Sequence, residues 1–514
     1  MPPMKFFYKP LYSLYRDGYR HNRKIVYREN PSQKEIQTEL LSDRSRILYS
    51  SAFRRLQQKA QVFSMETNSN VRSRLTHSLE VADLGRRLAD RITTDMKERE
   101  RSGKKLPGFR MEEFSFVASI VENACLMHDI GNPPFGHFGE SAIQDWAIHD
   151  VREALPSNVV YDTYLEGLMA DFREFDGNPQ GFRMVTRLLG DNGLCLTCAT
   201  LLCALKYART TGAPSGDGIL KKAGWFQTEQ RLAERLADQV GRSTAVRYPL
   251  TYIMEAADDI SYCMSDIADG IEKRILTEEE FILAFCKHWE ALNEKKAVQK
   301  KEAISRGDKD ANKLIGAMEL PREIRKFYNG TTVKTQKLRD FNLDFAISWA
   351  TRATEEAARK YREHHEEIYN GTAAPLTSYE GEMSRVLTVI GKVCCDLLYP
   401  SIEAESIELT GYAVISGIIK EHARLLKLPY EDFRKVAEGD RKHFPVETRQ
   451  YNRFDKGCVE SYRRAVGALA QDEHFLQKEW WLRVHLLVDH ISSMTDAFAL
   501  ETYQMLKGIA LMRT

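Results

Sequence analysis

The chain has 514 residues, of which 43% are hydrophobic, and its formal net charge at pH 7 is +1. This length predicts two or more packed units or one large helical body. The nearly neutral balance excludes the strongly basic composition typical of many nucleic-acid-binding proteins. No apolar run approaches the ~18 residues that span a membrane, and the first residues lack the apolar stretch of a signal peptide. We therefore expect a cytoplasmic protein without a membrane span.

The first 38 residues are expected to form a basic, aromatic arm. Residues 1–30 contain seven Lys or Arg and two acidic residues, with several Tyr and Phe among them. This composition is compatible with contact to phosphates. We favour an extended segment that lies on a neighbouring domain or subunit.

After the arm, apolar residues recur at helical spacing almost throughout the chain. His77 shares a helix face with Val81, Leu84 and Leu88, and this helix is expected to end near Ile92. A second apolar helix is expected to end with the dipeptide His128-Asp129. A third helix is expected over residues 250–275, with an apolar side that consists of Ala257, Ile260, Met264 and Ile267.

The C-terminal half is also predicted to be mostly helical. Residues 341–369 and 485–512 each have the pattern of one long helix. Residues 404–414 are the best candidate for a short hairpin or an irregular segment. The predicted fold class is therefore all-α, with a catalytic core at 39–275 and a helical C-terminal region at 276–514.

Candidate metal ligands occur on three of the predicted helices. His77 lies on an apolar face, where an unpaired imidazole would be costly. His128 and Asp129 end the second helix, and the third helix offers Asp258 or Asp259. Three or four such ligands can hold one divalent cation. Histidine and carboxylate without cysteine suit Mg, Mn, Fe, Co or Zn.

The helical spacing distinguishes the two aspartates of the third helix. Asp258, Tyr262 and Asp266 recur every four residues and share one face. Asp259 lies about 100° away from that face. We therefore predict that Asp258 is the ligand and that Asp259 is a supporting or capping residue.

The segment "GNPPFGHFGE" at 131–140 follows the second helix directly. Gly-Asn and Pro-Pro interrupt a helix, so the chain is expected to turn sharply here. The turn would return His137 and Glu140 toward the metal ligands. Because these residues are three apart, a restarted helix lets them form a hydrogen-bonded acid/base pair.

Phosphate binding requires cations, and several lie near the candidate ligands. Arg74 precedes His77 by about one helical turn. No P-loop or dinucleotide-binding glycine motif is present in the sequence, which argues against a nucleotide site of either kind. The candidate cations are Arg54, Arg55, Lys59, Arg72, Arg74, Lys206, Arg209, Lys221 and Lys222.

These motifs together resemble those of HD-domain phosphohydrolases. The pattern of His77, His128-Asp129 and Asp258 is the HD pattern. The strings "RRLQQKAQVF", "RSRLTHSLEV", "CLMHDIGNPPFGHFGE" and "MEAADDISYC" resemble, more narrowly, the bacterial deoxyguanosinetriphosphate triphosphohydrolases. The resemblance implies an all-α HD-domain core with an additional helical C-terminal body. It implies a reaction in which a dNTP and water give a deoxynucleoside and tripolyphosphate.

The resemblance also implies residue roles. His77, His128, Asp129 and Asp258 would hold a divalent cation, with Mg or Mn expected first and Co, Fe or Zn left open. His137 and Glu140 would be the catalytic pair. Tyr262 would pack on the sugar, Gln61 and Asp266 would bind the 3′-hydroxyl, Glu408 would contact guanine, and Arg441 would reach an adjacent subunit. The implied triphosphate contacts are Arg74, Asn178, Lys206, Tyr207 and Lys222.

The implied partners are dGTP or another dNTP, further copies of the chain in a hexamer, and single-stranded DNA as a regulator. Two alternatives were weighed. A different HD hydrolase, such as a phosphodiesterase or a nucleotidase, is disfavoured because dinuclear enzymes need more core histidines. Besides His77, His128 and His137, the predicted core at 39–275 contains only His149. A nucleic-acid-binding or regulatory protein with a vestigial site is disfavoured by the complete ligand set.

Overall fold

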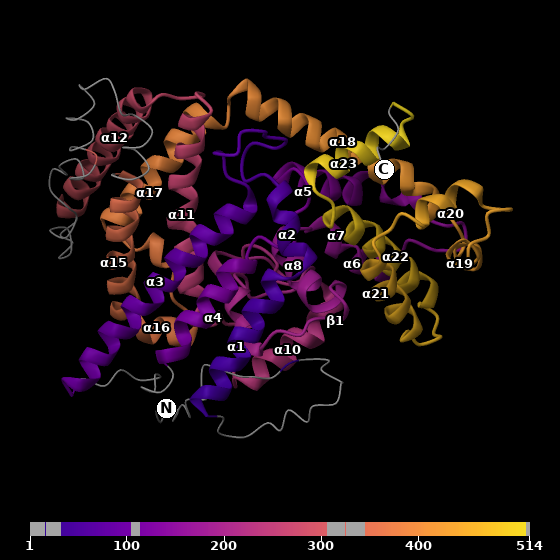
Figure 1. Ribbon diagram of the computed structural model, residues 1–514, viewed down its shortest axis with the longest axis horizontal. Helices are drawn as coiled ribbons and strands as arrows, with labels where there is room; N and C mark the ends of the chain where they lie inside the picture. Colours follow the sequence, from indigo (N-terminus) through magenta and orange to yellow (C-terminus); the bar gives the residue numbers. More distant parts are fainter. Residues whose placement is uncertain (1–15, 17–31, 104–113, 306–323, 325–344, 510–514) are drawn as a thin grey trace.

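The computed structural model describes residues 16, 32–103, 114–305, 324 and 345–509 (Figure 1). These residues are largely helical and include one short strand segment, β1 (Asp191–Leu194). The predicted all-α fold class is confirmed. Among the described helices, none has the length and apolar character needed to cross a membrane.

Three helices, which we call the central helices, pack against one another (Figure 1). α3 (Arg74–Arg101) packs along α4 (Phe114–Met127), and α11 (Thr251–Glu272) packs against both. α15 (Ile347–Glu363) also packs on α3 and α11. Each central helix buries a stripe of apolar side chains at helical spacing, and Leu88 of α3 is fully buried. This packing brings the start of α3, the end of α4 and the middle of α11 together.

α3 extends beyond its predicted end. The sequence predicted that the helix ends near Ile92, but it continues to Arg101. Ile92 and Met96 are both buried, so the apolar stripe continues for another turn. No glycine or proline interrupts residues 92–101, and packing therefore stabilises the longer helix.

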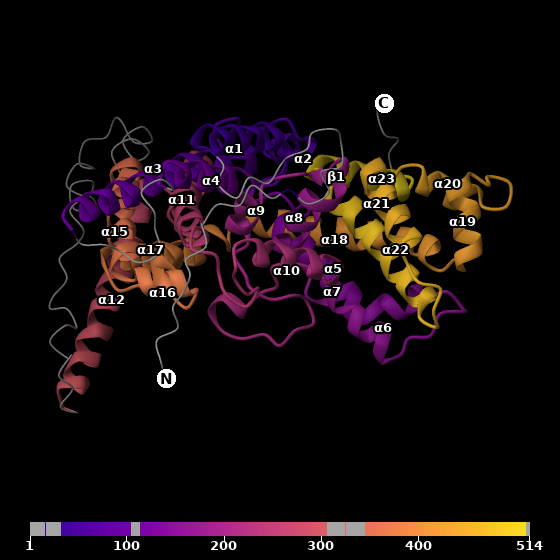
Figure 2. The ribbon, with the colours of Figure 1, turned by 90° about the horizontal axis from the view of Figure 1, so that it is seen from below.

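The other elements before α12 lie around the three central helices (Figure 2). α1 and α9 pack on α4. α5 packs against α18, a long helix of the C-terminal half. These elements are α1 (Gln33–Leu48), α2 (Ser51–Arg55), α5 (Gly136–Asp145), α6 (Thr163–Leu168), α7 (Ala170–Arg173), α8 (Gly177–Arg183), α9 (Cys198–Ala204) and α10 (Gln230–Gln239).

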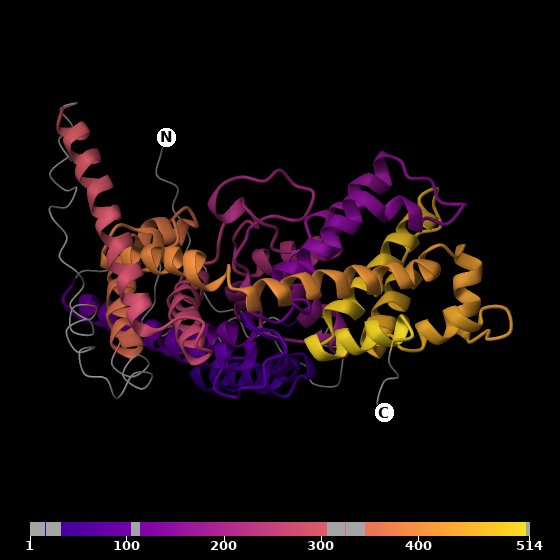
Figure 3. The same cartoon turned by 90° about the horizontal axis from the view of Figure 1, so that it is seen from above.

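In the C-terminal half, α18 runs along much of the molecule and reaches α22 and α23 (Figures 1 and 3). α12 projects from one end, and α19 and α20 lie at the opposite end (Figure 3). The predicted helix over 341–369 divides at His364 into α15 and α16. The elements are α12 (Glu278–Ser305), α16 (His365–Asn370), α17 (Glu382–Val393), α18 (Ile402–Leu426), α19 (Tyr430–Glu438), α20 (Pro445–Tyr451), α21 (Lys456–Gly467), α22 (Phe475–Ser492) and α23 (Asp496–Leu506).

The prediction of a hairpin or an irregular segment over residues 404–414 is wrong, because these residues belong to α18. Ser401 caps this helix by accepting the backbone N–H of Ala404 at 3.3 Å. Gly411 lies where α18 crosses Phe135, and a Cβ at this position would be 2.4 Å from the Cβ of Phe135. The glycine is therefore explained by close packing and not by a turn.

The prediction of a single helix over residues 485–512 is also wrong. α22 ends at Ser492, and α23 begins at Asp496. The side chain of Thr495 caps α23 by accepting the backbone N–H of Phe498 at 3.3 Å. After the break, the side chain of Asp496 accepts the backbone N–H groups of Ala60 and Phe135.

Apolar residues on both sides of residue 275 form one continuous hydrophobic core. α1 begins at Gln33, before the predicted boundary at residue 39. The division into 1–38, 39–275 and 276–514 therefore stays a prediction about organisation.

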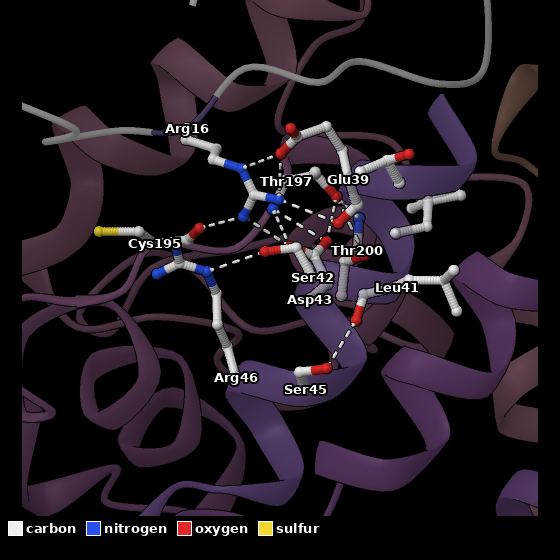
Figure 4. Close-up of polar contacts among 12 residues, drawn as sticks. Arg16, Glu39, Leu41, Ser42, Asp43, Ser45, Arg46, Cys195, Thr197 and Thr200 are labelled. Carbon is white, nitrogen blue, oxygen red and sulfur yellow. Dashed lines mark hydrogen bonds and ion pairs between the residues drawn. The ribbon is translucent and has the colours of Figure 1, made fainter. Parts of the chain in front are cut away.

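Within the predicted arm, Arg16 is described and is buried (Figure 4). Its guanidinium donates to Asp43 of α1 at 2.6 Å, to Glu39 at 2.8 Å, and to the carbonyl of Cys195. Asp43 also accepts from the hydroxyl of Thr197 at 2.5 Å. Burial raises the pKa of Asp43, and Arg16 opposes this shift. At this residue the arm contacts its own chain. The prediction of a contact with another subunit concerns residues outside those described.

Candidate active site

Four of the predicted ligands converge where α3, α4 and α11 meet. Single ligand atoms of His77, His128 and Asp129 all lie within 4.8 Å of one another. Oδ1 of Asp258 lies 3.3 Å from Nε2 of His77 and 3.3 Å from Nε2 of His128. We call these four residues the ligand cluster.

The spacing within the ligand cluster matches that of ligands around one ion. Two ligands bound at about 2.1 Å and at angles of about 90–109° lie about 3.0–3.4 Å apart. The two 3.3 Å separations from Asp258 to the imidazoles fall in this range. The cluster can therefore accept a cation with little rearrangement of these three side chains.

A neighbouring carbonyl orients the imidazole of His128. Nδ1 of His128 donates to the carbonyl of Cys125 at 2.7 Å, which leaves Nε2 facing the carboxylates. Burial by itself lowers the pKa of His128, but the charges of Asp258 and Asp129 outweigh burial and raise that pKa. A cation in the cluster would compete with this protonation.

Both carboxylates of the cluster are held in the ionised form. Burial alone would raise the pKa of Asp258, but the ammonium of Lys206 and the imidazole of His128 keep it well below its usual value. The charge of Arg74 likewise lowers the pKa of Asp129, although burial alone would raise that pKa. Nη1 of Arg74 donates to Oδ1 of Asp129 at 2.9 Å. Ionised carboxylates are the form that binds a metal.

Asp259 lies apart from the cluster, as the helical stripe predicted. Its Oδ2 accepts from the hydroxyl of Thr377 at 2.6 Å. Burial and the charge of Glu255 raise the pKa of Asp259 to about 7. The two adjacent aspartates therefore differ in environment, and Asp258 faces the imidazoles.

The chain turns sharply after α4, as predicted. Gly131 has φ 115° and Gly136 has φ 56°, both in the region that favours glycine. Phe135 also has a positive φ of 62° and directly precedes α5. A Cβ at Gly131 would be 2.1 Å from the backbone nitrogen of Gly181 in α8. The turn and α8 therefore touch through their backbones.

Gly131→Ala is expected to lower the free energy of unfolding by at least about 3 kcal/mol, because the Cβ would collide with backbone that cannot rotate away. Chemical denaturation measures this change. Gly439→Ala is the matched control, since Gly439 has φ 95° but open space around its Cβ position. Its expected cost is about 1–2 kcal/mol. Equal costs at the two positions would contradict the close approach to α8.

The turn returns His137 and Glu140 to the site on α5. Nδ1 of His137 lies 2.7 Å from Oε2 of Glu140. The other oxygen of Glu140 accepts the backbone N–H of Gly177 at 2.7 Å, so this buried carboxylate is fixed at both oxygens. The hydrogen bond to Glu140 raises the pKa of His137, whose side chain is 82% exposed. The pair can transfer a proton to or from a bound molecule.

Several predicted triphosphate contacts are paired with acids. Lys206 forms an ion pair with Asp258. Nζ of Lys222 lies 2.5 Å from Oδ2 of Asp176, and the amide of Asn178 donates to the other oxygen of Asp176. Tyr207 follows Lys206 in the chain. Burial raises the pKa of the Tyr207 hydroxyl, and the charges of Lys222 and Lys206 oppose this shift. These cations form one side of the site, and each has a carboxylate partner that a bound anion could replace.

Two of the predicted sugar contacts, Tyr262 and Asp266, lie about one turn apart on α11. The ring of Tyr262 lies 6.5 Å from that of His77, and its hydroxyl is 3.1 Å from the hydroxyl of Tyr399. Tyr399 donates to Oδ2 of Asp266 at 2.8 Å. Burial raises the pKa of Asp266 to about 7, and the hydrogen bond from Tyr399 opposes this shift. Oε1 of Gln61 and Oδ1 of Asp266 are buried and have no hydrogen-bond partner within the described part of the chain.

Glu408 and Arg441 differ in their relation to the site. Glu408 is on α18, where Tyr412 donates to Asp145 of α5 at 2.9 Å. Burial raises the pKa of Glu408, and the nearby His137 opposes this shift. Arg441 is exposed between α19 and α20, at the end of the molecule far from α11 (Figure 1). Within one chain the fold brings Glu408, but not Arg441, to the site.

Comparison with known proteins agrees with this geometry. The HD domain family model matches residues 74–163, a range that contains three of the four cluster residues and the His137–Glu140 pair. The deoxyguanosinetriphosphate triphosphohydrolase of Klebsiella pneumoniae subsp. pneumoniae is 33% identical over 93% of this chain and 96% of its own length. The proteins of the same name from Salmonella typhimurium and Salmonella paratyphi A are 34% and 35% identical, each over 93% of this chain and 95% of its own length.

This chain belongs to the deoxyguanosinetriphosphate triphosphohydrolase family. The resemblance inferred from the sequence motifs is confirmed, and the family makes the chain a hydrolase. The HD domain of this family implies a bound divalent cation. The residues present fit such an ion, because Oδ2 of Asp129 is buried without a hydrogen-bond partner among the described residues. A buried carboxylate oxygen left in this state is costly unless a cation compensates it.

Sequence reasoning missed two polar residues of this family member's site. Asp176 caps α8 by accepting the N–H of Asn178 at 2.9 Å, and it pairs with Lys222. The sequence "DGNP" is a helix-start signal that could have identified it. Tyr399 comes from a segment 133 residues after Asp266, and no local pattern links the two.

Proposed function

We propose that this protein hydrolyses dGTP to deoxyguanosine and tripolyphosphate in a reaction that depends on a divalent cation, with Mg²⁺ or Mn²⁺ as the expected ion. The observation that carries the proposal is the convergence of His77, His128, Asp129 and Asp258 on one buried point in a chain of this family. In this role they hold the cation against the α-phosphate. A bound divalent cation would polarise a phosphoryl oxygen and lower the pKa of water.

The proposed catalytic pair is His137 and Glu140. Glu140 is fixed by Gly177 and holds Nδ1 of His137, which leaves Nε2 of this exposed ring free to exchange a proton with water or the 5′-oxygen. Which of the two residues moves each proton stays open. General acid–base catalysis of this kind contributes about 10²–10⁴-fold to a rate.

The proposed triphosphate site uses cations that are already close to the cluster. A triphosphate carries about four negative charges, so its binding needs several cations besides the metal. When Asp258 binds the metal, Lys206 can turn from this carboxylate to a phosphate. Lys222 can likewise leave Asp176. The full proposed set is Arg74, Asn178, Lys206, Tyr207 and Lys222.

The proposed sugar and base contacts follow from the arrangement on α11 and α18. The unpartnered buried oxygens of Gln61 and Asp266 are suited to a 3′-hydroxyl. In this proposal the ring of Tyr262 packs on the sugar, where it would clash with a 2′-hydroxyl. Glu408 would accept from the guanine edge, and Arg441 would serve an adjacent subunit. A hexamer, a single-stranded DNA regulator and a cytoplasmic location belong to the same proposal and rest on resemblance.

Product identification tests the proposed function. The protein is incubated with each of the four dNTPs and Mn²⁺, and ³¹P NMR identifies the released phosphate species. Tripolyphosphate, formed fastest from dGTP, is expected. Pyrophosphate or inorganic phosphate as the first product would contradict the reaction and indicate another HD hydrolase. No turnover of any dNTP would favour the regulatory protein with a vestigial site.

Replacing Tyr262 by alanine is expected to reduce the preference for dGTP over GTP at least about tenfold, because removal of the ring creates space for a 2′-hydroxyl. The ratio of kcat/KM values for the two nucleotides measures the effect. Tyr262→Phe is the matched control, since it keeps the ring and loses the hydroxyl contact with Tyr399. If Phe and Ala reduce the preference equally, the ring is not the filter.

A further inference from the structure

The turn between α4 and α5 needs support that it does not supply itself. Phe135 has φ 62° although it is not glycine, a conformation that costs roughly 1–2 kcal/mol. It directly precedes α5, and no side chain within the turn caps this helix end. The side chain of His137 is 82% exposed, so packing does not hold it in place. Besides its hydrogen bond to Glu140, its position therefore depends on the backbone of Phe135 and Gly136.

A carboxylate from the C-terminal half holds this backbone. Oδ1 of Asp496, the first residue of α23, accepts the N–H of Phe135 at 3.1 Å. Oδ2 of the same side chain accepts the N–H of Ala60 at 3.0 Å. Asp496 is 3% exposed. One buried side chain thus joins the turn to the segment that precedes α3.

Lys59 makes a second link at the same place. Its Nζ donates to the carbonyl of Asn132, in the turn, at 2.5 Å, and to the carbonyl of Ser492, at the end of α22, at 2.7 Å. Its own carbonyl accepts the N–H of Arg74 at 2.9 Å. Burial lowers the pKa of Lys59 to about 7, while the charge of Asp496 opposes this shift. Lys59 and Asp496 therefore fix the two ends of residues 132–135.

We propose that Lys59 and Asp496 are positioning residues, which hold residues 132–135 in the strained conformation that directs His137 and Glu140 toward the ligand cluster. This inference rests on the proposed roles of His137 and Glu140. Neither Lys59 nor Asp496 touches the substrate in this proposal. We expect their effect on kcat more than on KM, because residues 132–135 include none of the proposed substrate contacts, and the bond from Arg74 to Lys59 uses the backbone carbonyl of Lys59.

Asp496→Asn tests the proposal with little change in shape. The asparagine oxygen can accept one N–H, and its NH₂ group then faces the other, so one backbone donor loses its acceptor. We expect kcat for dGTP to fall about 10–100-fold, KM to change less than about threefold, and hydrogen exchange in a peptide covering residues 130–140 to become at least about tenfold faster. Lys59→Met, which keeps the apolar stem, is expected to give the same pattern.

The control is Asp162→Asn. Asp162 caps α6 by accepting the N–H of Leu165 at 3.0 Å, and it lies outside the turn and its supports. It is expected to leave kcat and the exchange of residues 130–140 unchanged. Wild-type kcat in either test variant, unchanged exchange, or an equal effect of the control would overturn the proposal. If the wild-type protein forms no tripolyphosphate, the proposed function fails, while the exchange measurement still shows whether Asp496 and Lys59 hold the turn.

Discussion

Asp258→Asn is expected to lower kcat/KM for dGTP by at least about a thousandfold and to weaken Mn²⁺ binding by at least about a hundredfold. Asp258 lies 3.3 Å from the imidazoles of His77 and His128, and the proposed cation lies among these groups. Loss of the charge removes one ligand and also leaves Lys206 without its carboxylate partner. Elemental analysis of the purified variant and calorimetric titration with Mn²⁺ measure metal binding directly, without reference to activity.

The neighbouring residue provides a matched control for this substitution. Asp259→Asn has the same chemistry at the next position, but Asp259 bonds to Thr377 and faces away from the cluster. Because burial raises its pKa to about 7, the neutral asparagine is close to a form that Asp259 already adopts near neutral pH. We expect Asp259→Asn to retain Mn²⁺ and to lose less than about tenfold in kcat/KM. Equal losses in the two variants would refute Asp258 as the ligand.

Glu140→Gln is expected to lower kcat by about 10²–10⁴-fold, which corresponds to about 2.7–5.5 kcal/mol of transition-state stabilisation. The glutamine can still accept the N–H of Gly177 and keeps the shape of the side chain. Binding of dGTP is expected to change little, because Glu140 makes no proposed phosphate contact. Single-turnover kinetics separate the chemical step from binding. Turnover close to wild type would remove Glu140 from the mechanism.

The same variant has an expected pH dependence. The hydrogen bond to Glu140 raises the pKa of His137, so His137 stays protonated to a higher pH in the wild-type protein. Removal of the carboxylate charge lowers this pKa toward its ordinary value. The inflection of the kcat–pH profile that belongs to His137 should therefore move to lower pH in Glu140→Gln. An unchanged inflection would show that another group titrates there.

The local part of the site follows from patterns within single helices. The apolar spacing around His77 and before His128 predicts two buried imidazoles. Both side chains are buried in the structure, His77 on α3 and His128 directly after the end of α4. The stripe of Asp258, Tyr262 and Asp266 selects the aspartate that faces the imidazoles. These predictions hold because the 3.6-residue period determines which side chains share a face, whatever the helix packs against.

The errors lie where tertiary packing outweighs local preference. Residues 404–414 were predicted as a hairpin or an irregular segment, but they belong to α18, where Gly411 packs closely against Phe135. The apolar pattern over 485–512 gave no indication of the break before Asp496. Thr495 provides a cap, yet threonine alone does not predict whether a helix stops.

By itself, the sequence determined the all-α class, the identities of the candidate ligands and their helix faces, because these depend on residue chemistry and on spacing within a few turns. Only the tertiary structure decided that Tyr399 meets Asp266 and that Lys59 and Asp496 hold the turn at Phe135. Asp496 is separated from Phe135 by 361 positions. Such contacts arise when whole helices pack together to bury apolar surface, and no local spacing encodes which distant residues then become neighbours.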